Sequence, residues 1–312
     1  MQQMATSTDP EQGWILVSGG TGFVGRHLIG RLLATGARII VYTRSEQKCR
    51  DLFGTRVRAL SSLAELQTET HLAAMVNLAG LPIMGFPWTP QRRRLLLQSR
   101  IATTDALVAL ASRLSRPPAV LVSASAIGYY GVHGDEPVDE RTTPTADFQS
   151  LLCQQWEQAA MQCESLGTRV TRLRLGVVLG ADGGALPQLL RPARLGMGAI
   201  LGTGRQWISW IHIEDVVGLF ELALRDAAVS GAVNATSPHA VTQEQLQRAI
   251  AQTLHRPLWL RVPAPPIRLA LGELAQLLVD GQRVIPTRAT ELGYHFQYPD
   301  IDSALRQITH PR

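Results

Sequence analysis

A loop that binds phosphate groups is predicted by the spacing of four glycines near the amino terminus: Gly19, Gly20, Gly22 and Gly25. The apolar residues 15–17 before them predict a buried strand, and the apolar pattern after them predicts a helix. Glycine is needed because a Cβ atom would block both the sharp bend and the close approach of a phosphate to the backbone. We therefore expect a pyrophosphate at the start of this helix. The expected contacts are Gly19, Gly20, Thr21, Gly22, Phe23, Val24 and Gly25.

The end of the second predicted strand, residues 38–43, indicates which dinucleotide this loop would hold. A site for NAD usually has Asp or Glu here, about 20 residues after the glycines, to bind the ribose 2′-hydroxyl. This sequence has Thr43 and Arg44 instead, and Arg44 offers a planar guanidinium that matches phosphate oxygens. We therefore expect NADP(H), with Lys48 adding positive charge on the next helix. The alternatives are a strand–helix turn that binds no ligand and an Arg44 that only faces solvent.

Side chains that could exchange a proton follow the fifth predicted strand, residues 119–123. Ser125 could hydrogen-bond a substrate carbonyl, and Tyr129 or Tyr130 could donate a proton to it. Each candidate also has a structural alternative. The serine could satisfy backbone groups where the strand ends, and the tyrosines could pack against the cofactor or against the lobe above it.

The composition argues against several classes of function. The three cysteines, Cys49, Cys153 and Cys163, have neither the spacing of a metal site nor that of a disulfide framework, so we expect no metal and a reducing, cytoplasmic compartment. No apolar run approaches the roughly 20 residues of a membrane span, and we expect no membrane partner. The net charge is +5, but the dense basic cluster at 92–94 is short and lacks interleaved aromatic residues, which argues against nucleic acid.

Strand and helix patterns alternate from residue 14 to residue 180, which is typical of a doubly wound parallel sheet. After the second strand, the expected strands are 57–60, 73–78, 119–123 and 170–179, and the expected helices are 45–53, 62–67, 90–114 and 147–165. Beyond residue 180, shorter segments separated by glycine and proline predict a smaller α+β lobe. We therefore expect a disordered leader at 1–13, a dinucleotide-binding domain at 14–180 and a C-terminal substrate or cap lobe at 181–312.

Further motifs in this sequence resemble those of one known family. They are GGTGFVGRHL at 19–28, VNLAG at 76–80, SRI at 99–101, SASAIGYYG at 123–131, Phe148 with Trp156 and Glu157, LRLGVVLG at 173–180 and QWISWIHI at 206–213. Together they resemble the atypical extended short-chain dehydrogenases/reductases of the NAD-dependent epimerase/dehydratase-like family, which carry a C-terminal domain of unknown function. The resemblance covers nearly the whole chain after residue 13.

This resemblance implies a Rossmann-like α/β fold with bound NADP(H). It places Thr43, Arg44, Leu78, Ala79, Arg100 and Val178 around the cofactor, and we add Gly80 from the same motif as Leu78. One departure is the segment 85–88, Gly-Phe-Pro-Trp, where similar proteins often have Arg before the Trp. Nothing is carried over within that loop.

Typical members of the superfamily move a proton with a Tyr-x-x-x-Lys pair, which this sequence lacks. Lys48 is its only lysine, and alignment of the expected helix on Glu157 places Gln149 and Cys153 at the two positions. Three classes of function stay open: an NADP(H)-dependent oxidoreductase or epimerase of unknown small-molecule substrate, a dinucleotide-binding sensor or scaffold, and a regulator of cell division. The resemblance implies the last class, because a plant and cyanobacterial branch is linked to division, and a regulator would need a protein partner.

Overall fold

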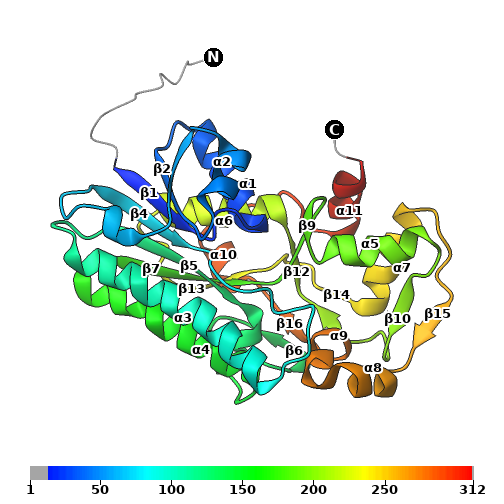
Figure 1. The fold of residues 1–312 in the computed structure, drawn as a ribbon. Helices are drawn as coiled ribbons and strands as arrows, with labels where there is room; N and C mark the ends of the chain where they lie inside the picture. The colour runs from blue at the N-terminus through cyan, green and yellow to red at the C-terminus, as the bar shows by residue number, and fades with distance from the viewer. Residues whose placement is uncertain (1–12, 311–312) are drawn as a thin grey trace.

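The computed structural model describes residues 13–310, so the leader expected at 1–13 lies, except for Gly13, outside the described residues. At the centre of the molecule is a seven-stranded parallel sheet in the order β13-β7-β5-β4-β1-β2-β3 (Figure 1). The strands are β1 (Trp14–Ser18), β2 (Ile39–Tyr42), β3 (Val57–Leu60), β4 (Leu72–Asn77), β5 (Val120–Ala126), β7 (Arg169–Leu175) and β13 (Gly231–Ala235). The strand order reverses between β1 and β4, which confirms the predicted doubly wound α/β fold.

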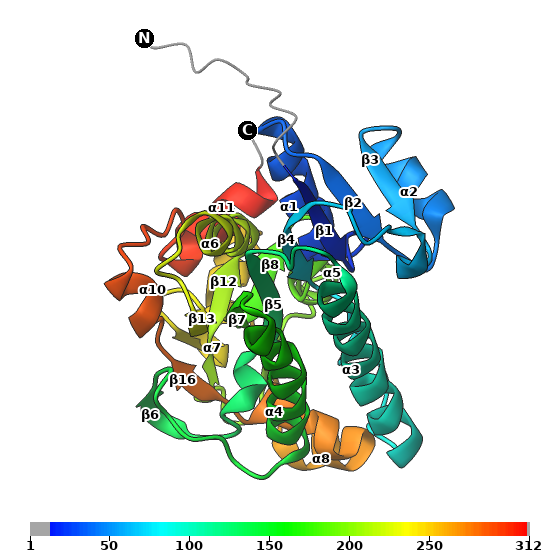
Figure 2. The same ribbon diagram turned by 90° about the vertical axis from the view of Figure 1, so that its left-hand side faces the viewer.

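Helices cover both faces of this sheet (Figure 2). One face carries α1 (Phe23–Ala34), α2 (Glu46–Phe53) and α6 (Ile213–Arg225), and the other carries α3 (Pro90–Arg113) and α4 (Phe148–Met161). Successive strand residues point to opposite faces, so Val17 lies in the apolar cluster of Leu28, whereas Leu16 lies in that of Leu107. Because both faces are covered, a central strand such as β2 is apolar throughout.

Local sequence sets where the helices near the site begin. The Thr89 hydroxyl accepts a hydrogen bond from the Arg92 N–H at 3.1 Å, and Pro90 occupies the first position of α3, as predicted. The Asp147 carboxylate caps α4 by accepting from the Ser150 N–H at 3.0 Å. Each cap fixes the residue at which its helix begins, and therefore which of its side chains face the catalytic candidates.

The strand predicted at 170–179 is wrong as a single element. The structure breaks it at Gly176 into β7 and β8 (Val177–Gly180), and β8 leaves the central sheet to pair with β12 (Trp210–His212). A Cβ atom on Gly176 would lie 2.5 Å from the Ser209 carbonyl oxygen, so only glycine allows these two segments of the backbone to approach this closely. The segment after Gly176 is thereby directed away from the sheet and toward the glycine loop.

The central sheet also takes a strand from beyond residue 180, where we expected the dinucleotide-binding domain to end. β13 pairs with the outer edge of β7, and α6 packs beside α1 on the sheet. This pairing satisfies the backbone groups that β7 would otherwise leave open at the edge. Residues 213–235 therefore belong to the sheet layer rather than to the second lobe.

The remainder of the chain forms the smaller α+β lobe that the sequence predicted (Figure 1). Its elements are β9 (Gly183–Gly184), α5 (Leu186–Arg194), β10 (Ala199–Leu201), β11 (Trp207–Ile208), β14 (Val241–Thr242), α7 (Gln243–Thr253), β15 (Leu260–Val262), α8 (Ala264–Leu271), α9 (Gln276–Val279), β16 (Gln282–Val284) and α11 (Ile301–Thr309). The short helix α10 (Thr287–Glu291) instead packs against β13 of the central sheet. Single 3₁₀ segments are η1 (Leu63–Glu65), where a longer helix was predicted, η2 (Ile127–Tyr129), η3 (Gln162–Leu166) and η4 (Gly272–Ala275). β16 pairs with β6 (Gly134–Val138), which joins the lobe to the segment after β5.

Candidate active site

Two glycines of the loop between β1 and α1 occupy positions where a side chain would not fit. Gly19 has a φ of 71°, and a Cβ atom there would lie 2.6 Å from the carbonyl oxygen of Leu78. A Cβ atom on Gly25 would lie 2.5 Å from the carbonyl oxygen of Gly19. Gly22 is the N-cap of α1 and has no side chain to bond the first backbone N–H groups of the helix. An anion can therefore bind these groups, which is the fit that a pyrophosphate requires.

Other residues expected around the cofactor lie where β4 ends, next to the glycine loop. The Leu78 N–H donates to the Ser18 carbonyl at 3.0 Å, which holds the two strand ends together. Ala79 and Gly80 follow, and the Gly80 backbone lies against the Arg100 side chain of α3. The structure thus places these residues at the switch point between β1 and β4, where a doubly wound sheet binds its ligand.

The hairpin formed by β8 and β9 covers the start of α1. A Cβ atom on Gly183 would lie 2.3 Å from the Phe23 ring, so this glycine makes room for the ring. Val178 of β8 lies in the same apolar cluster as Phe23. Arg26 of α1 pairs with Asp182 in the hairpin at 2.7 Å. The segment after β7 therefore packs over the start of α1, next to the glycine loop.

Thr43 and Arg44 lie just past the end of β2. Arg44 is exposed, and within residues 13–310 it forms no hydrogen bond or ion pair with a side chain. The next carboxylate along the chain is Glu46, whose pKa is lowered by a hydrogen bond from Ser61 at 2.7 Å. Glu46 also pairs with Arg50 at 3.3 Å. This carboxylate is occupied by protein groups, whereas the guanidinium of Arg44 is free to bind a ligand.

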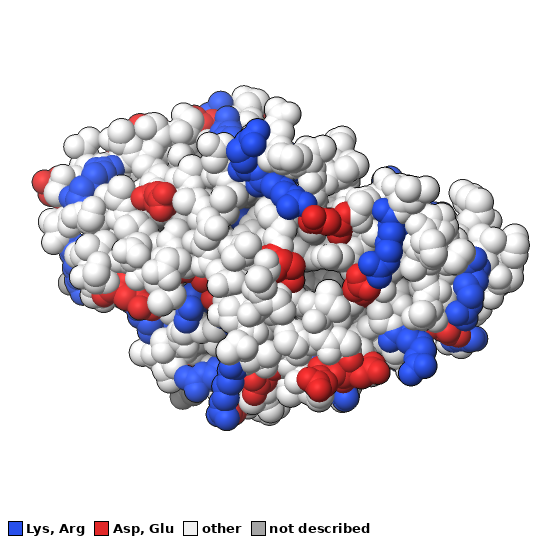
Figure 3. All heavy atoms as spheres, turned by 90° about the horizontal axis from the view of Figure 1, so that it is seen from below, with Lys and Arg blue, Asp and Glu red and all other residues white. Residues whose placement is uncertain are grey.

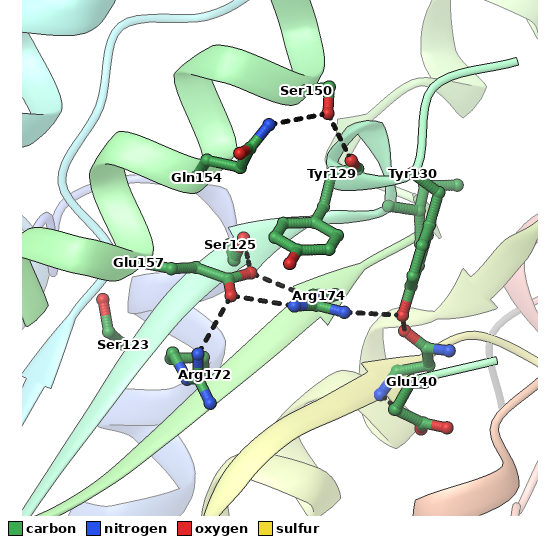
Figure 4. A network of polar contacts seen from close by, with 12 residues as sticks. Ser123, Ser125, Tyr129, Tyr130, Glu140, Ser150, Gln154, Glu157, Arg172 and Arg174 are labelled. Carbon is green, nitrogen blue, oxygen red and sulfur yellow. Dashed lines mark hydrogen bonds and ion pairs between the residues drawn. The ribbon is translucent and has the colours of Figure 1, made fainter. Parts of the chain in front are cut away.

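Ser125 and Tyr130 are both buried, and each hydroxyl donates its proton to a protein acceptor (Figure 4). The Ser125 hydroxyl donates to Oε1 of Glu157 at 2.7 Å. The Tyr130 hydroxyl donates to the Asn234 side chain at 2.6 Å and accepts from Arg174 at 2.9 Å. Burial raises the pKa of Tyr130 to about 12. Tyr130 therefore holds β13 against β7 and is poorly suited to give up a proton near neutral pH.

Tyr129 lies beside Tyr130 in the sequence but in different surroundings. Its side chain is only partly buried, and within the described residues its hydroxyl has no hydrogen-bond partner. The Arg174 guanidinium lies over its ring, with the Cζ atom 3.4 Å from the ring centre. Of the two tyrosines, Tyr129 is the one whose hydroxyl is available to a substrate.

A buried ion pair that the sequence analysis missed supports these residues. Arg174 of β7 contacts Glu157 of α4 through two parallel bonds, Nε to Oε1 at 2.8 Å and Nη2 to Oε2 at 2.9 Å. Arg172 adds a third contact to Glu157 at 3.3 Å. Two guanidinium groups thus share one carboxylate, which leaves one net positive charge in this cluster. A signal was present, because β7 contains three arginines, Arg169, Arg172 and Arg174, whereas a strand that is covered on both faces is usually apolar.

Gln149 and Cys153 stand on the face of α4 that meets η2. A Cβ atom on Gly128 would lie 3.3 Å from Oε1 of Gln149 and 3.8 Å from Sγ of Cys153. Burial raises the pKa of the Cys153 thiol to about 12, so this thiol is uncharged near neutral pH. Neither residue can supply the phenol or the cation of a Tyr-x-x-x-Lys pair.

A family model described as the NAD-dependent epimerase/dehydratase family matches residues 15–235 of this chain. The chain belongs to this family. A second model, a domain of unknown function (DUF1731), matches residues 262–308. The two matches confirm the resemblance found in the motifs, and the second covers the C-terminal part of the smaller lobe.

Relatives within the epimerase/dehydratase family match nearly the whole chain. Epimerase family protein YfhF of Bacillus subtilis is 37% identical over 94% of this chain and 97% of its own length. The chloroplastic SDR39U1 homologue of Arabidopsis thaliana is 38% identical over 98% of this chain and 89% of its own length. A crystal structure of the human epimerase family protein SDR39U1 with NADPH is 31% identical, covers 96% of this chain and 100% of that chain, and has a TM-score of 0.85.

A more distant solved structure shares the fold alone. UDP-glucose 4-epimerase of Thermus thermophilus, in complex with NAD, has a TM-score of 0.76 but only 16% identity.

Across residues 13–310, no helix is long and apolar enough to cross a membrane. The same residues contain no group of three or more His, Cys, Asp or Glu side chains placed to hold a metal ion.

Proposed function

We propose that this chain binds NADP(H) and acts as an oxidoreductase or epimerase on a small molecule that carries a carbonyl or alcohol group. The observation that carries this proposal is the exposed Arg44 past the end of β2, where the next carboxylate along the chain, Glu46, is occupied by protein groups. A guanidinium in this place suits a 2′-phosphate, whereas an NAD site usually offers a carboxylate. The human relative whose crystal structure contains NADPH supports the same cofactor.

Bound NADP(H) would supply a hydride to the substrate carbonyl carbon or accept one from the alcohol. The chain itself has to position the substrate and exchange a proton with its oxygen. We assign the proton exchange to Tyr129, because its hydroxyl is free within the described residues and the Tyr130 hydroxyl is not. The cluster of Arg172, Arg174 and Glu157 has a net positive charge and lies against the Tyr129 ring. It offers a positive charge near the tyrosine in a chain that lacks the family's usual lysine.

Ser125 has a positioning role in this proposal. Its proton is directed to Glu157, so its oxygen lone pairs are available to accept a hydrogen bond. A substrate alcohol or the Tyr129 hydroxyl can donate to them. Ser125 thereby orients the oxygen at which the proton is exchanged, but it does not itself supply the proton.

Replacing Ser125 with alanine tests this role. We expect Ser125→Ala to lower turnover by about tenfold, the value of one lost hydrogen bond, and to leave NADPH affinity unchanged. NADPH consumption is measured against a panel of carbonyl compounds, and NADPH affinity is measured by calorimetry. Weaker NADPH binding with unchanged turnover would instead assign Ser125 to the cofactor. If the wild type binds NADPH but converts no compound, a sensor or scaffold replaces the oxidoreductase.

We also propose that the partner is a small molecule rather than nucleic acid. In the basic cluster at 92–94, Arg92 donates to the Pro82 carbonyl at 2.6 Å, and Arg93 pairs with Glu273 at 2.5 Å. On the face drawn in Figure 3, basic and acidic residues are interspersed among uncharged ones instead of forming one basic stripe.

A reducing cytoplasm remains the proposed compartment, supported by three buried and unpaired cysteines.

A further inference from the structure

An apolar wall lies beside the catalytic candidates. It is built from the loop before α3, the first turns of α4 and the C-terminal segment around η4. Figure 2 shows α8, which directly precedes η4, near the lower ends of α3 and α4. The side chains that define the wall are Ile83, Met84, Trp88, Phe148, Leu152 and Leu274. Tyr129 and Cys153 belong to the same cluster. The wall therefore adjoins both the proposed proton donor and the helix face where the family's usual relay would stand.

The polar atoms of this wall are bonded within the protein. The Trp88 indole Nε1 donates to the Ile83 carbonyl at 3.0 Å. The Trp88 ring meets the Phe148 ring edge-on, with 5.2 Å between the ring centres. Trp88, Leu152 and Leu274 are buried, but Ile83, Met84 and Phe148 are only partly buried, so apolar surface of these three remains to be covered. A ligand at this wall meets mainly carbon atoms, and it gains by removing them from water.

The arginines that border the wall hold its loop in place. Three loop carbonyls accept from them: Pro82 from Arg92 at 2.6 Å, Trp88 from Arg93 at 3.1 Å and Leu81 from Arg100 at 3.1 Å. On the side of the C-terminal lobe, Arg268 of α8 pairs with Asp280 at 2.7 Å. Outer nitrogens of Arg92 and Arg100 are bonded to loop carbonyls, and their Nε atoms are buried without a partner in the described residues. The diphosphate of a sugar nucleotide could therefore bind these cations only by displacing the loop.

We propose that the substrate is an apolar ketone or aldehyde, or the corresponding alcohol, rather than a nucleoside diphosphate sugar. This proposal rests on the NADP(H)-dependent function above and narrows its substrate class. Sugar hydroxyls and a diphosphate need hydrogen-bond partners and free cations, and leaving them unpaired against an apolar wall is costly. An apolar chain or ring beside the reacting carbonyl has no such need.

Two successive titrations separate this substrate class from the function on which it rests. NADPH is first titrated into the protein, and a failure to bind would remove the proposed function and the substrate class together. The NADPH-loaded protein is then titrated with benzylacetone and, separately, with UDP-glucose, and NADPH fluorescence and heat are recorded. We expect benzylacetone to bind more tightly by about tenfold or more. Equal or tighter binding of UDP-glucose, or no binding of benzylacetone, would overturn the substrate class while cofactor binding stands.

Ile83→Thr tests the wall itself, because it keeps a branched side chain and exchanges carbon surface for a hydroxyl. We expect this variant to bind benzylacetone about tenfold more weakly than the wild type and to keep its NADPH affinity, which also reports that it is folded. Leu269→Thr on α8 is the matched control, since Leu269 is 90% exposed and lies outside the wall. Unchanged benzylacetone binding in Ile83→Thr, or an equal loss in Leu269→Thr, would contradict the proposal.

Discussion

Replacing Glu157 with alanine is expected to lower the free energy of unfolding by about 3–5 kcal/mol, because it leaves a buried charge without its partner. The side chains of Arg174 and Glu157 are 3% and 4% exposed, and two parallel hydrogen bonds join them. Alanine removes the carboxylate while the Arg174 guanidinium stays between β7, α4 and the Tyr129 ring. Water cannot easily replace the lost partner at this depth.

Urea unfolding followed by far-ultraviolet circular dichroism measures this loss. Glu291→Ala is the control, because Glu291 pairs with Arg141 at 3.9 Å on the surface, where such pairs contribute at most about 1 kcal/mol. A loss below about 1 kcal/mol in Glu157→Ala would contradict the role of this ion pair as the support of the site. Replacing Glu157 and Arg174 together with apolar residues should destabilise the protein less than Glu157→Ala alone.

The second large effect is expected on turnover. Tyr129→Phe should lower the turnover number by about a hundredfold or more, which is the usual contribution of a proton donor. The phenyl ring keeps its position on Arg174, so folding and NADPH affinity should be retained. The rate of NADPH consumption is measured with the most active carbonyl compound found for the wild type.

Tyr130→Phe serves as the matched control for this prediction. It loses the hydrogen bonds to Asn234 and Arg174, so we expect it to be less stable than the wild type. Its turnover number should stay within about threefold of the wild-type value, because the Tyr130 hydroxyl is not the proton donor in this proposal. A severe loss of turnover in Tyr130→Phe with little change in Tyr129→Phe would reverse the assignment.

The parts of the fold that depend on local sequence could be predicted. The strand at 57–60 has the predicted bounds, and α3 begins at Pro90, because caps, proline and apolar runs act within a few residues. The glycine loop has the strand before it and the helix after it that its spacing indicated. These features are determined by neighbours in the chain.

Features that depend on distant contacts could not be predicted. The break at Gly176 is required by the Ser209 carbonyl, and the seventh strand comes from residues 231–235, which pair with β7 only after the fold forms. Tyr129 and Tyr130 cannot be told apart by type or position in the sequence. Their difference comes from Asn234, which lies 104 residues further along the chain and takes the hydroxyl of Tyr130.

The central claim, that this chain selects NADP(H) through Arg44, is tested most directly by parallel calorimetric titrations of NADPH and NADH into the wild type and Arg44→Ala. A charge-assisted bond contributes about 1.5–3 kcal/mol, so we predict that Arg44→Ala weakens NADPH binding by roughly ten- to a hundredfold. NADH affinity should be unchanged, and Arg58→Ala on neighbouring β3, also exposed, should behave as the wild type. Equal affinities of the wild type for the two dinucleotides, or an unaltered preference in Arg44→Ala, would contradict the claim.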